Sequence, residues 1–159
     1  MIGAWALGAW GRARATLDLD FLVMLDEEGL PRLEALMTQK GMVMDAAWQE
    51  SNPMLRGSQV RFQFQGVAVD ILRPRDAHDR QLFRRRRRKR LEGRYYWLVA
   101  PEDFILQKLK VGRPRDFEDV LTVLQRPGGK LDRAYLLRWG ARLGVSSELR
   151  YVLTPPRLT

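Results

Sequence analysis

Two neighbouring segments of the sequence, one of alternating polar and apolar residues and one largely apolar, constrain the fold most strongly. Residues 59–65 alternate almost without fault, and a second, largely apolar segment at 67–72 follows directly after Gly66. Side chains of a strand point to opposite faces in turn, so an alternating run predicts a half-buried strand. A short connection that contains glycine predicts that the two strands form an antiparallel hairpin.

Helices and further strands are expected on both sides of this hairpin. Their order predicts a mixed α/β (α+β) sheet of about four strands flanked by helices, with a helical C-terminal part. We expect a main domain over residues 1–126 and, after the break at Pro127-Gly128-Gly129, a helical extension over 127–159 packed on the same unit. The expected strands are 17–25, 42–48 and 95–99, the expected helices are 4–10, 31–40, 101–111, 115–125, 131–143 and 146–153, and residues 76–92 are expected to be helical in part.

Composition narrows the classes of function. The formal net charge of +9 favours polyanionic partners such as RNA, DNA or nucleotide phosphates. The chain has no cysteine, which excludes disulfides, zinc–thiolate sites and thiol catalysis. Because His78 is the one histidine of the chain, metal sites that need several imidazoles are excluded. We expect His78 to cap or decorate a turn. No segment resembles a membrane span or a signal peptide, so we expect a cytoplasmic protein without a membrane partner.

The strand expected at residues 17–25 carries two acids. Leu17, Leu19 and Phe21 are expected to face the core, which leaves Asp18 and Asp20 together on the opposite face. Mg²⁺ takes oxygen ligands, usually one or two carboxylates together with water and substrate phosphates. The pair therefore indicates a site for Mg²⁺ or Mn²⁺ beside a bound nucleoside triphosphate (NTP), or else an ordinary solvated strand face.

Three motifs in order resemble a known family over roughly residues 3–125. The first is the run from Gly11 to Asp20, which matches a Gly-x-x-Arg-x-Thr-x-Asp-x-Asp arrangement. The second is Asp70 among apolar residues, and the third is Pro101-Glu102-Asp103 followed by Lys108 and an Arg-Asp-x-x-Asp segment at 115–119. Together they resemble the minimal nucleotidyltransferase domains of the polymerase-beta-like superfamily, especially the bacterial toxin-antitoxin and abortive-infection group.

The resemblance implies a nucleotidyltransferase-like sheet and assigns roles to single residues. It implies that Asp18, Asp20 and Asp70 are catalytic and bind Mg²⁺ or Mn²⁺, with Lys108 as a fourth catalytic residue. It also implies that four residues at a helix start and after it bind the nucleotide: Gly3, Ala4, Arg14 and Thr16.

Several roles have two interpretations. Arg14 contacts a phosphate or pairs with an acid. Lys108 holds a phosphate or bridges Asp103 or Asp116. Asp116 and Asp119 are expected to fix the packing of two helices through Arg113 or Arg115.

The start of the chain departs from the family pattern. Relatives carry a helix and a strand before the turn at Gly3, whereas this sequence shows only Met1-Ile2 there. We expect either a misplaced start of the chain or a reduced form of the domain, with one strand fewer in the sheet and a weaker grip on the nucleotide. An apolar edge left open in this way favours a homodimer.

The run of basic residues at 84–90 is the strongest local charge signal. A helix there would carry cations on all sides, and a phosphate backbone would relieve their repulsion. Base stacking on Tyr95, Tyr96 and Trp97 is a further expectation. The alternative is a solvated charged face, and the residues expected to contact nucleic acid are Arg84, Arg85, Arg86, Arg87 and Arg88.

The leading hypothesis for function is a Mg²⁺-dependent nucleotidyltransferase. It would move a nucleoside monophosphate from NTP to a hydroxyl of RNA such as tRNA, of protein or of a small molecule. The alternative is a non-catalytic module of the same fold that binds RNA or a cognate partner protein, as an antitoxin does. A metal-dependent nuclease is disfavoured, because no Glu-x-Lys follows the acids.

Overall fold

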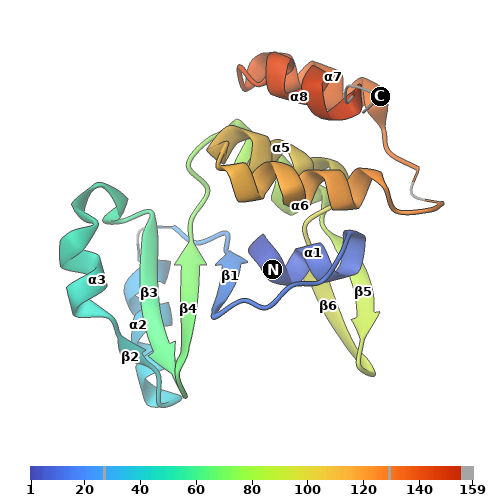
Figure 1. The fold of residues 1–159 in the computed structure, drawn as a ribbon. Helices are drawn as coiled ribbons and strands as arrows, with labels where there is room; N and C mark the ends of the chain where they lie inside the picture. Colours follow the sequence, from blue (N-terminus) through green and yellow to red (C-terminus); the bar gives the residue numbers. More distant parts are fainter. Residues whose placement is uncertain (27, 129, 155–159) are drawn as a thin grey trace. The chain divides into compact units, whose positions relative to one another are not determined.

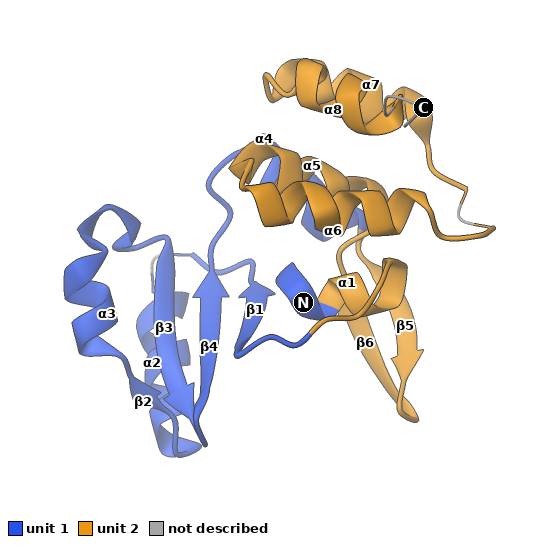
Figure 2. Cartoon of the chain, in the orientation of Figure 1, with its two compact units in different colours: residues 1–5, 15–85 blue, residues 6–14, 86–159 orange. Residues whose placement is uncertain are grey.

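The chain folds into two compact units of mixed α/β structure. A computed structural model describes residues 1–26, 28–128 and 130–154. The first unit comprises residues 1–5 and 15–85, and the second comprises residues 6–14 and 86–159 (Figure 2). The predicted fold class is confirmed, since a four-stranded mixed sheet and a two-stranded sheet accompany helices that dominate the C-terminal part. The boundary expected after residue 126 lies inside the second unit.

A four-stranded sheet organises the first unit. Its strands are β1 (Asp18–Leu22), β2 (Val43–Met44), β3 (Gln59–Phe64) and β4 (Val67–Leu72), in the order β1-β4-β3-β2 (Figure 1). The predicted hairpin is confirmed as β3 and β4, which pair antiparallel, whereas β1 pairs parallel with β4. The two residues between β3 and β4, Gln65 and Gly66, have φ of 49° and 78°. Positive φ at both positions is the geometry of a tight hairpin turn.

One face of this sheet is apolar and is covered by α2 (Gly29–Gln39). The buried cluster on that face consists of Val60, Phe62, Val69 and Ile71, and side chains of α2 pack against it. Leu19 and Phe21 join the cluster as predicted, but the prediction for Leu17 is wrong. Leu17 precedes β1 and is 85% exposed.

The strand expected over residues 42–48 is shorter than predicted. Only Val43–Met44 pairs with β3, and α3 (Ala46–Ser51) begins directly afterwards. The carboxylate of Asp45 accepts a hydrogen bond from the backbone N–H of Trp48, with an N–O distance of 3.0 Å. This N-cap satisfies a donor that a helix start would otherwise leave open, and it ends the strand. The 3₁₀ turn η1 (Pro53–Leu55) and α4 (Ala77–Arg85) complete the unit.

The second unit contains a hairpin and four consecutive helices. Strands β5 (Arg87–Leu91) and β6 (Arg94–Leu98) pair antiparallel. The helices are α5 (Pro101–Val111), α6 (Pro114–Leu124), α7 (Arg133–Arg142) and α8 (Ser146–Leu153), close to the predicted ranges. Helix α1 (Gly3–Trp10) contributes residues 3–5 to the first unit and the rest to the second. Trp10 donates its indole N–H to the carbonyl of Val99 at 2.7 Å.

The prediction that residues 76–92 are helical in part is confirmed, because α4 covers residues 77–85, and from Arg87 onward the basic run is strand β5. Strand pairing with the aromatic residues of β6 gives these arginines partners that a helix of like charges would lack. His78 does not decorate a turn, because it is buried in α4. None of the helices in the described part of the chain is long and apolar enough to cross a membrane.

Candidate functional site: an acidic sheet face under a glycine turn

The polar face of the four-stranded sheet brings together the three acids singled out in the sequence. The parallel register places Asp20 on β1 directly beside Asp70 on β4. Asp18 lies two residues before Asp20 and shares its face, because strand side chains alternate. The apolar cluster under α2 occupies the other face. Carboxylates from two adjacent strands therefore collect on one side of the first unit.

Arg61 is the partner of Asp70 on this face. The guanidinium donates its Nε–H to Oδ1 at 2.7 Å and an Nη2–H to Oδ2 at 2.6 Å, and Asp70 is only 3% exposed. The ring of Trp48 lies 4.6 Å from the guanidinium carbon. Hydrogen bonding to Asp70 raises the pKa of Arg61; burial lowers it, while the charges of Asp70 and Asp18 raise it further. The arrangement is a bidentate, half-buried ion pair within an acidic cluster.

The start of α1 lies against Asp20. The backbone N–H of Ile2 donates to the carbonyl oxygen of Asp20 at 2.9 Å. Gly3 has a φ of 63°, and a Cβ built on it would lie 1.9 Å from Oδ2 of Asp20. Thr16 donates its hydroxyl to the carboxylate of Asp18. The candidate nucleotide-binding residues Gly3 and Thr16 thus touch the candidate metal ligands, and Ala4 lies buried in the first turn of α1.

We predict that Gly3→Ala disturbs this site whereas Gly8→Ala does not. A Cβ at Gly3 would collide with the carboxylate of Asp20 in a backbone conformation that strains L-residues, whereas one at Gly8 would meet Ala13 at an ordinary 3.6 Å. Gly3→Ala should cost about 1–3 kcal/mol of unfolding free energy. Gly8→Ala should be neutral or stabilise by about 0.5–1 kcal/mol, because it removes glycine from a helix. Urea titration measures both, and equal midpoints for the two variants would refute the prediction.

The acidic face offers carboxylate oxygens, which are the type of ligand that Mg²⁺ takes. Among residues 1–26, 28–128 and 130–154, no group of three or more histidine or acidic side chains is arranged to hold a metal ion. Both oxygens of Asp70 accept hydrogen bonds from Arg61. Asp18 and Asp20 share one face of β1, and Mg²⁺ is commonly held by one or two carboxylates plus substrate phosphates.

Lys108 and Arg14 lie in the second unit, and both pair with acids. Lys108 Nζ lies 2.8 Å from Asp116 Oδ1 and 2.9 Å from Asp119 Oδ2. Arg14 Nε lies 3.0 Å from Asp119 Oδ1, and its Nη2 donates to Oδ2 at 3.2 Å. The sequence left two interpretations open for each cation, and the structure contains the one in which the cation pairs with an acid. Lys108 bridges to Asp116 and not to Asp103, whose carboxylate accepts a hydrogen bond from the Tyr135 hydroxyl.

This network fixes the packing of α5 and α6. Asp119 is 3% exposed and accepts from cations on α5 and on the segment before β1. Burial alone would raise the pKa of Asp119, but hydrogen bonds and charge from Arg14 and Lys108 outweigh it and lower the pKa below its usual value. The partner expected for Asp116, Arg113, lies 3.4 Å from it through a largely exposed side chain.

The five arginines expected to contact nucleic acid divide between different elements. Arg84 and Arg85 end α4 in the first unit, and Arg86, Arg87 and Arg88 lead into β5 in the second. Arg87 pairs with the buried Glu102, with an Nη2–Oε2 distance of 3.4 Å. The run is therefore not one uniform surface.

Arg61 is the residue of the acidic face that the sequence argument missed. A signal was present, because a two-residue turn at 65–66 sets the hairpin register and pairs residue 61 with residue 70. The alternation is compatible with Arg61 on the polar face, and once the turn is placed at residues 65–66 the register sets Asp70 opposite it.

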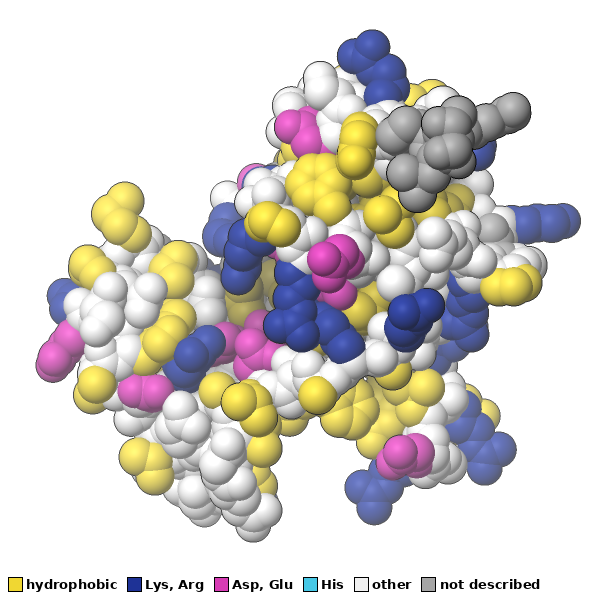
Figure 3. Space-filling model, in the orientation of Figure 1, with side chains coloured by type: hydrophobic (Ala, Val, Ile, Leu, Met, Phe, Trp, Pro, Cys, Tyr) yellow, Lys and Arg dark blue, Asp and Glu magenta, His cyan; other side chains and the backbone are white. Residues whose placement is uncertain are grey.

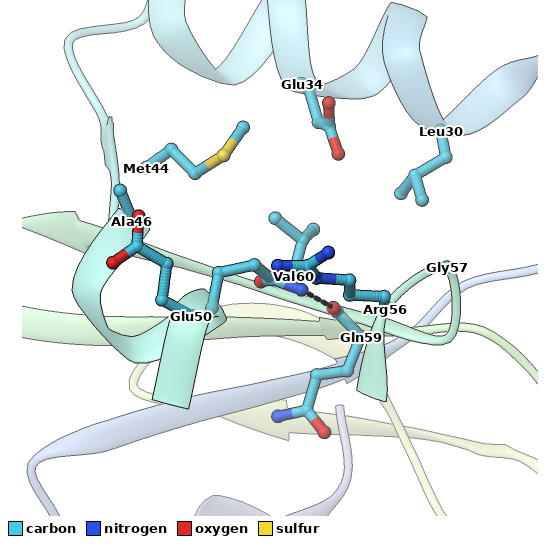
Figure 4. Close-up of a pocket in the computed structure, with 10 residues that line it drawn as sticks. Leu30, Glu34, Met44, Ala46, Glu50, Arg56, Gly57, Gln59 and Val60 are labelled. Atoms are coloured by element: carbon cyan, nitrogen blue, oxygen red, sulfur yellow. Dashed lines mark hydrogen bonds between the residues drawn. The ribbon is translucent and has the colours of Figure 1, made fainter. Parts of the chain in front are cut away.

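A separate pocket of about 330 Å³ lies in the first unit, between α2, α3 and β3 (Figure 4). Leu30, Glu34, Met44 and Arg56 line it, and Gln49 donates its amide N–H to the carbonyl of Gln59 at 3.2 Å. None of the three candidate acids lines this pocket.

No protein-family model matches the chain, and no match is found among curated proteins. The assignment of function therefore depends on the residues and their geometry.

Proposed function

We propose that this protein is a divalent-metal-dependent nucleotidyltransferase, which moves a nucleoside monophosphate from an NTP to a hydroxyl group. The observation that carries the proposal is the alignment of Asp18, Asp20 and Asp70 on one sheet face, with the glycine turn of α1 directly against Asp20. A solvated strand face would not require a glycine with positive φ packed onto one of its carboxylates. Such a glycine is required in a site that brings backbone N–H groups close to phosphates and carboxylates.

In the proposed reaction, Asp18 and Asp20 hold Mg²⁺ or Mn²⁺. When bound, the ion neutralises charge on the triphosphate as it develops. The backbone N–H groups at the start of α1 donate to phosphate oxygens, since a helix start leaves such donors open. Thr16 orients the carboxylate of Asp18.

Asp70 would act on the acceptor hydroxyl. The oxygen of that hydroxyl attacks the α-phosphorus, the bond from this phosphorus to the oxygen that bridges it to the β-phosphorus breaks, and pyrophosphate leaves. Asp70 accepts the proton of the hydroxyl after Arg61 has exchanged its carboxylate partner for a phosphate oxygen. A guanidinium binds carboxylate and phosphate with the same bidentate geometry, so this exchange preserves its hydrogen bonds.

The test is a transfer assay with each labelled NTP, Mg²⁺ or Mn²⁺, and a mixture of tRNA and cell protein as acceptors. Label should move to an acceptor with wild-type protein, and the transfer should vanish with chelator and in the Asp18→Ala, Asp20→Ala variant. If wild-type protein transfers no more label than this variant with any NTP, the proposal is wrong.

A second candidate function is a non-catalytic binding module of the same fold. The observation that favours it is the bidentate pair of Arg61 with Asp70, which neutralises the third acid. The same assay separates the two, because a binding module transfers no label under any of these conditions.

A further inference from the structure

The hairpin of β5 and β6 in the second unit has two chemically different faces. Its register pairs Arg88 with Trp97 and Arg90 with Tyr95, so these four side chains share one face. Arg86 lies two residues before Arg88 and joins that face. We call this face the stacking ladder, defined by Arg86, Arg88, Arg90, Tyr95 and Trp97.

The stacking ladder presents aromatic rings interleaved with guanidinium groups. The guanidinium carbon of Arg88 lies 4.1 Å from the ring centre of Tyr95, and that of Arg86 lies 4.8 Å from Trp97. Tyr95 is 60% exposed and Trp97 is 52% exposed. Neither Arg88 nor Arg90 forms an ion pair with any residue that the structure describes. Large aromatic rings held at the surface beside Arg88 and Arg90 are an open binding surface.

Side chains on the opposite face of the hairpin contact other parts of the second unit, although Arg87 and Lys89 themselves remain exposed. Lys89 and Arg87 lie over the ring of Trp10, at 4.7 Å and 5.9 Å from its centre, and Arg87 also pairs with Glu102. Leu98, the register partner of Arg87, is fully buried. Within residues 86–90, Arg87 and Lys89 therefore contact Trp10, whereas Arg86, Arg88 and Arg90 belong to the stacking ladder.

Charge identifies the chemistry of the partner. Residues 86–97 contain six basic residues and one acidic residue, Glu92. Figure 3 shows basic and hydrophobic side chains side by side along the hairpin. A polyanion without aromatic groups would use the arginines and leave the rings unused. Single-stranded nucleic acid uses both, because phosphates pair with guanidinium groups while bases stack on aromatic rings.

We propose that the stacking ladder binds single-stranded RNA. RNA is chosen because its loops and ends leave bases unpaired and free to stack. Paired bases in a duplex have their faces covered, so a duplex would engage only the arginines. The inference does not depend on the proposed nucleotide transfer, since it concerns the second unit and is measured without NTP or metal.

The experiment is fluorescence anisotropy of the full chain with a labelled 12-nucleotide oligouridine and with duplex RNA of equal length. The single strand should bind at least tenfold more tightly than the duplex. Arg88→Gln should weaken binding of the single strand about tenfold, whereas Lys89→Gln, which removes one charge from the opposite face, should change it less than threefold. Tyr95→Leu should also weaken it about tenfold while the charge is unchanged.

Three outcomes would overturn the proposal. The first is equal loss in Arg88→Gln and Lys89→Gln, which indicates charge alone. The second is unchanged affinity in Tyr95→Leu or equal binding of the duplex, which excludes stacking. The third comes from the same assay with a single-stranded DNA of equal length, and it is binding at least tenfold tighter than that of the single-stranded RNA. Far-UV circular dichroism and urea titration check that each variant remains folded, and Trp97→Leu provides a second test of stacking if Tyr95→Leu unfolds.

Discussion

Replacement of Asp20 by asparagine is expected to reduce nucleotide transfer about 1000-fold, which corresponds to about 4 kcal/mol of transition-state stabilisation. The amide keeps the size of the side chain, so it still fits against Gly3, but it removes the negative charge of a candidate metal ligand. Asp20 lies beside Asp70 in the strand register and follows Asp18 on the same face, so its loss weakens the centre of the acidic cluster.

The measurement is the initial rate of label transfer from NTP at saturating Mg²⁺. Glu118→Gln is the matched control, because Glu118 is an exposed carboxylate on α6 in the second unit and takes no part in the acidic face. The control should keep the wild-type rate. The free energy of unfolding of both variants should equal that of the wild type to within about 1 kcal/mol in urea titration. A rate for Asp20→Asn within threefold of wild type would exclude Asp20 as a metal ligand.

Asp119→Ala is expected to destabilise the protein by about 3 kcal/mol, because it removes the acid that two cations share. Removal of one partner from a buried ion pair is costly, since the remaining charge keeps its desolvation penalty. Lys108 retains Asp116 at 2.8 Å, which places the loss at the lower end of the usual range. Arg113→Ala is the control within the same network, since the Arg113 side chain is 76% exposed and its ion pair should contribute less than about 1 kcal/mol.

Acid should reduce the difference between wild type and Asp119→Ala. The pKa of Asp119 is lowered in the folded state from its ordinary value of 3.8, so its stabilisation is present above that pH and is lost as pH falls further. Urea titration at pH 7 and at pH 3 should therefore show a smaller gap at pH 3. A gap that grows in acid, or equal losses for Asp119→Ala and Arg113→Ala at pH 7, would contradict the role assigned to this network.

The local pattern of the sequence predicted the parts of the fold that depend on neighbouring residues. The alternation at 59–65, the apolar segment at 67–72 and the glycine between them predicted the hairpin but not its register, because the sequence pattern placed Gln65 in the strand and not in the turn. The period of two that side chains follow along a strand also predicted that Asp18 and Asp20 share a face. It was wrong for Leu17, because a pattern of period two cannot show where a strand begins. It also missed α3, since the side chain of Asp45 caps a helix where propensity favoured a longer strand.

The sequence left open how far the helix extends into the basic run. Seven consecutive cations carry no periodicity, so the sequence does not distinguish a helix from a strand there. Pairing with β6 decides it, because Arg88 and Arg86 gain the rings of Tyr95 and Trp97 only across a hairpin. Such cross-strand contacts join residues that a local pattern does not relate.

By itself, then, the sequence determined the fold class, the hairpin of β3 and β4, and the three acids that a metal site would need. Tertiary structure alone decided how these charges are compensated: Arg61 occupies Asp70, while Arg14 and Lys108 share Asp119. The physical reason is that ionic partners are selected by distance in space and by burial. These quantities depend on how strands register and helices pack, and the order of residues along the chain does not state them.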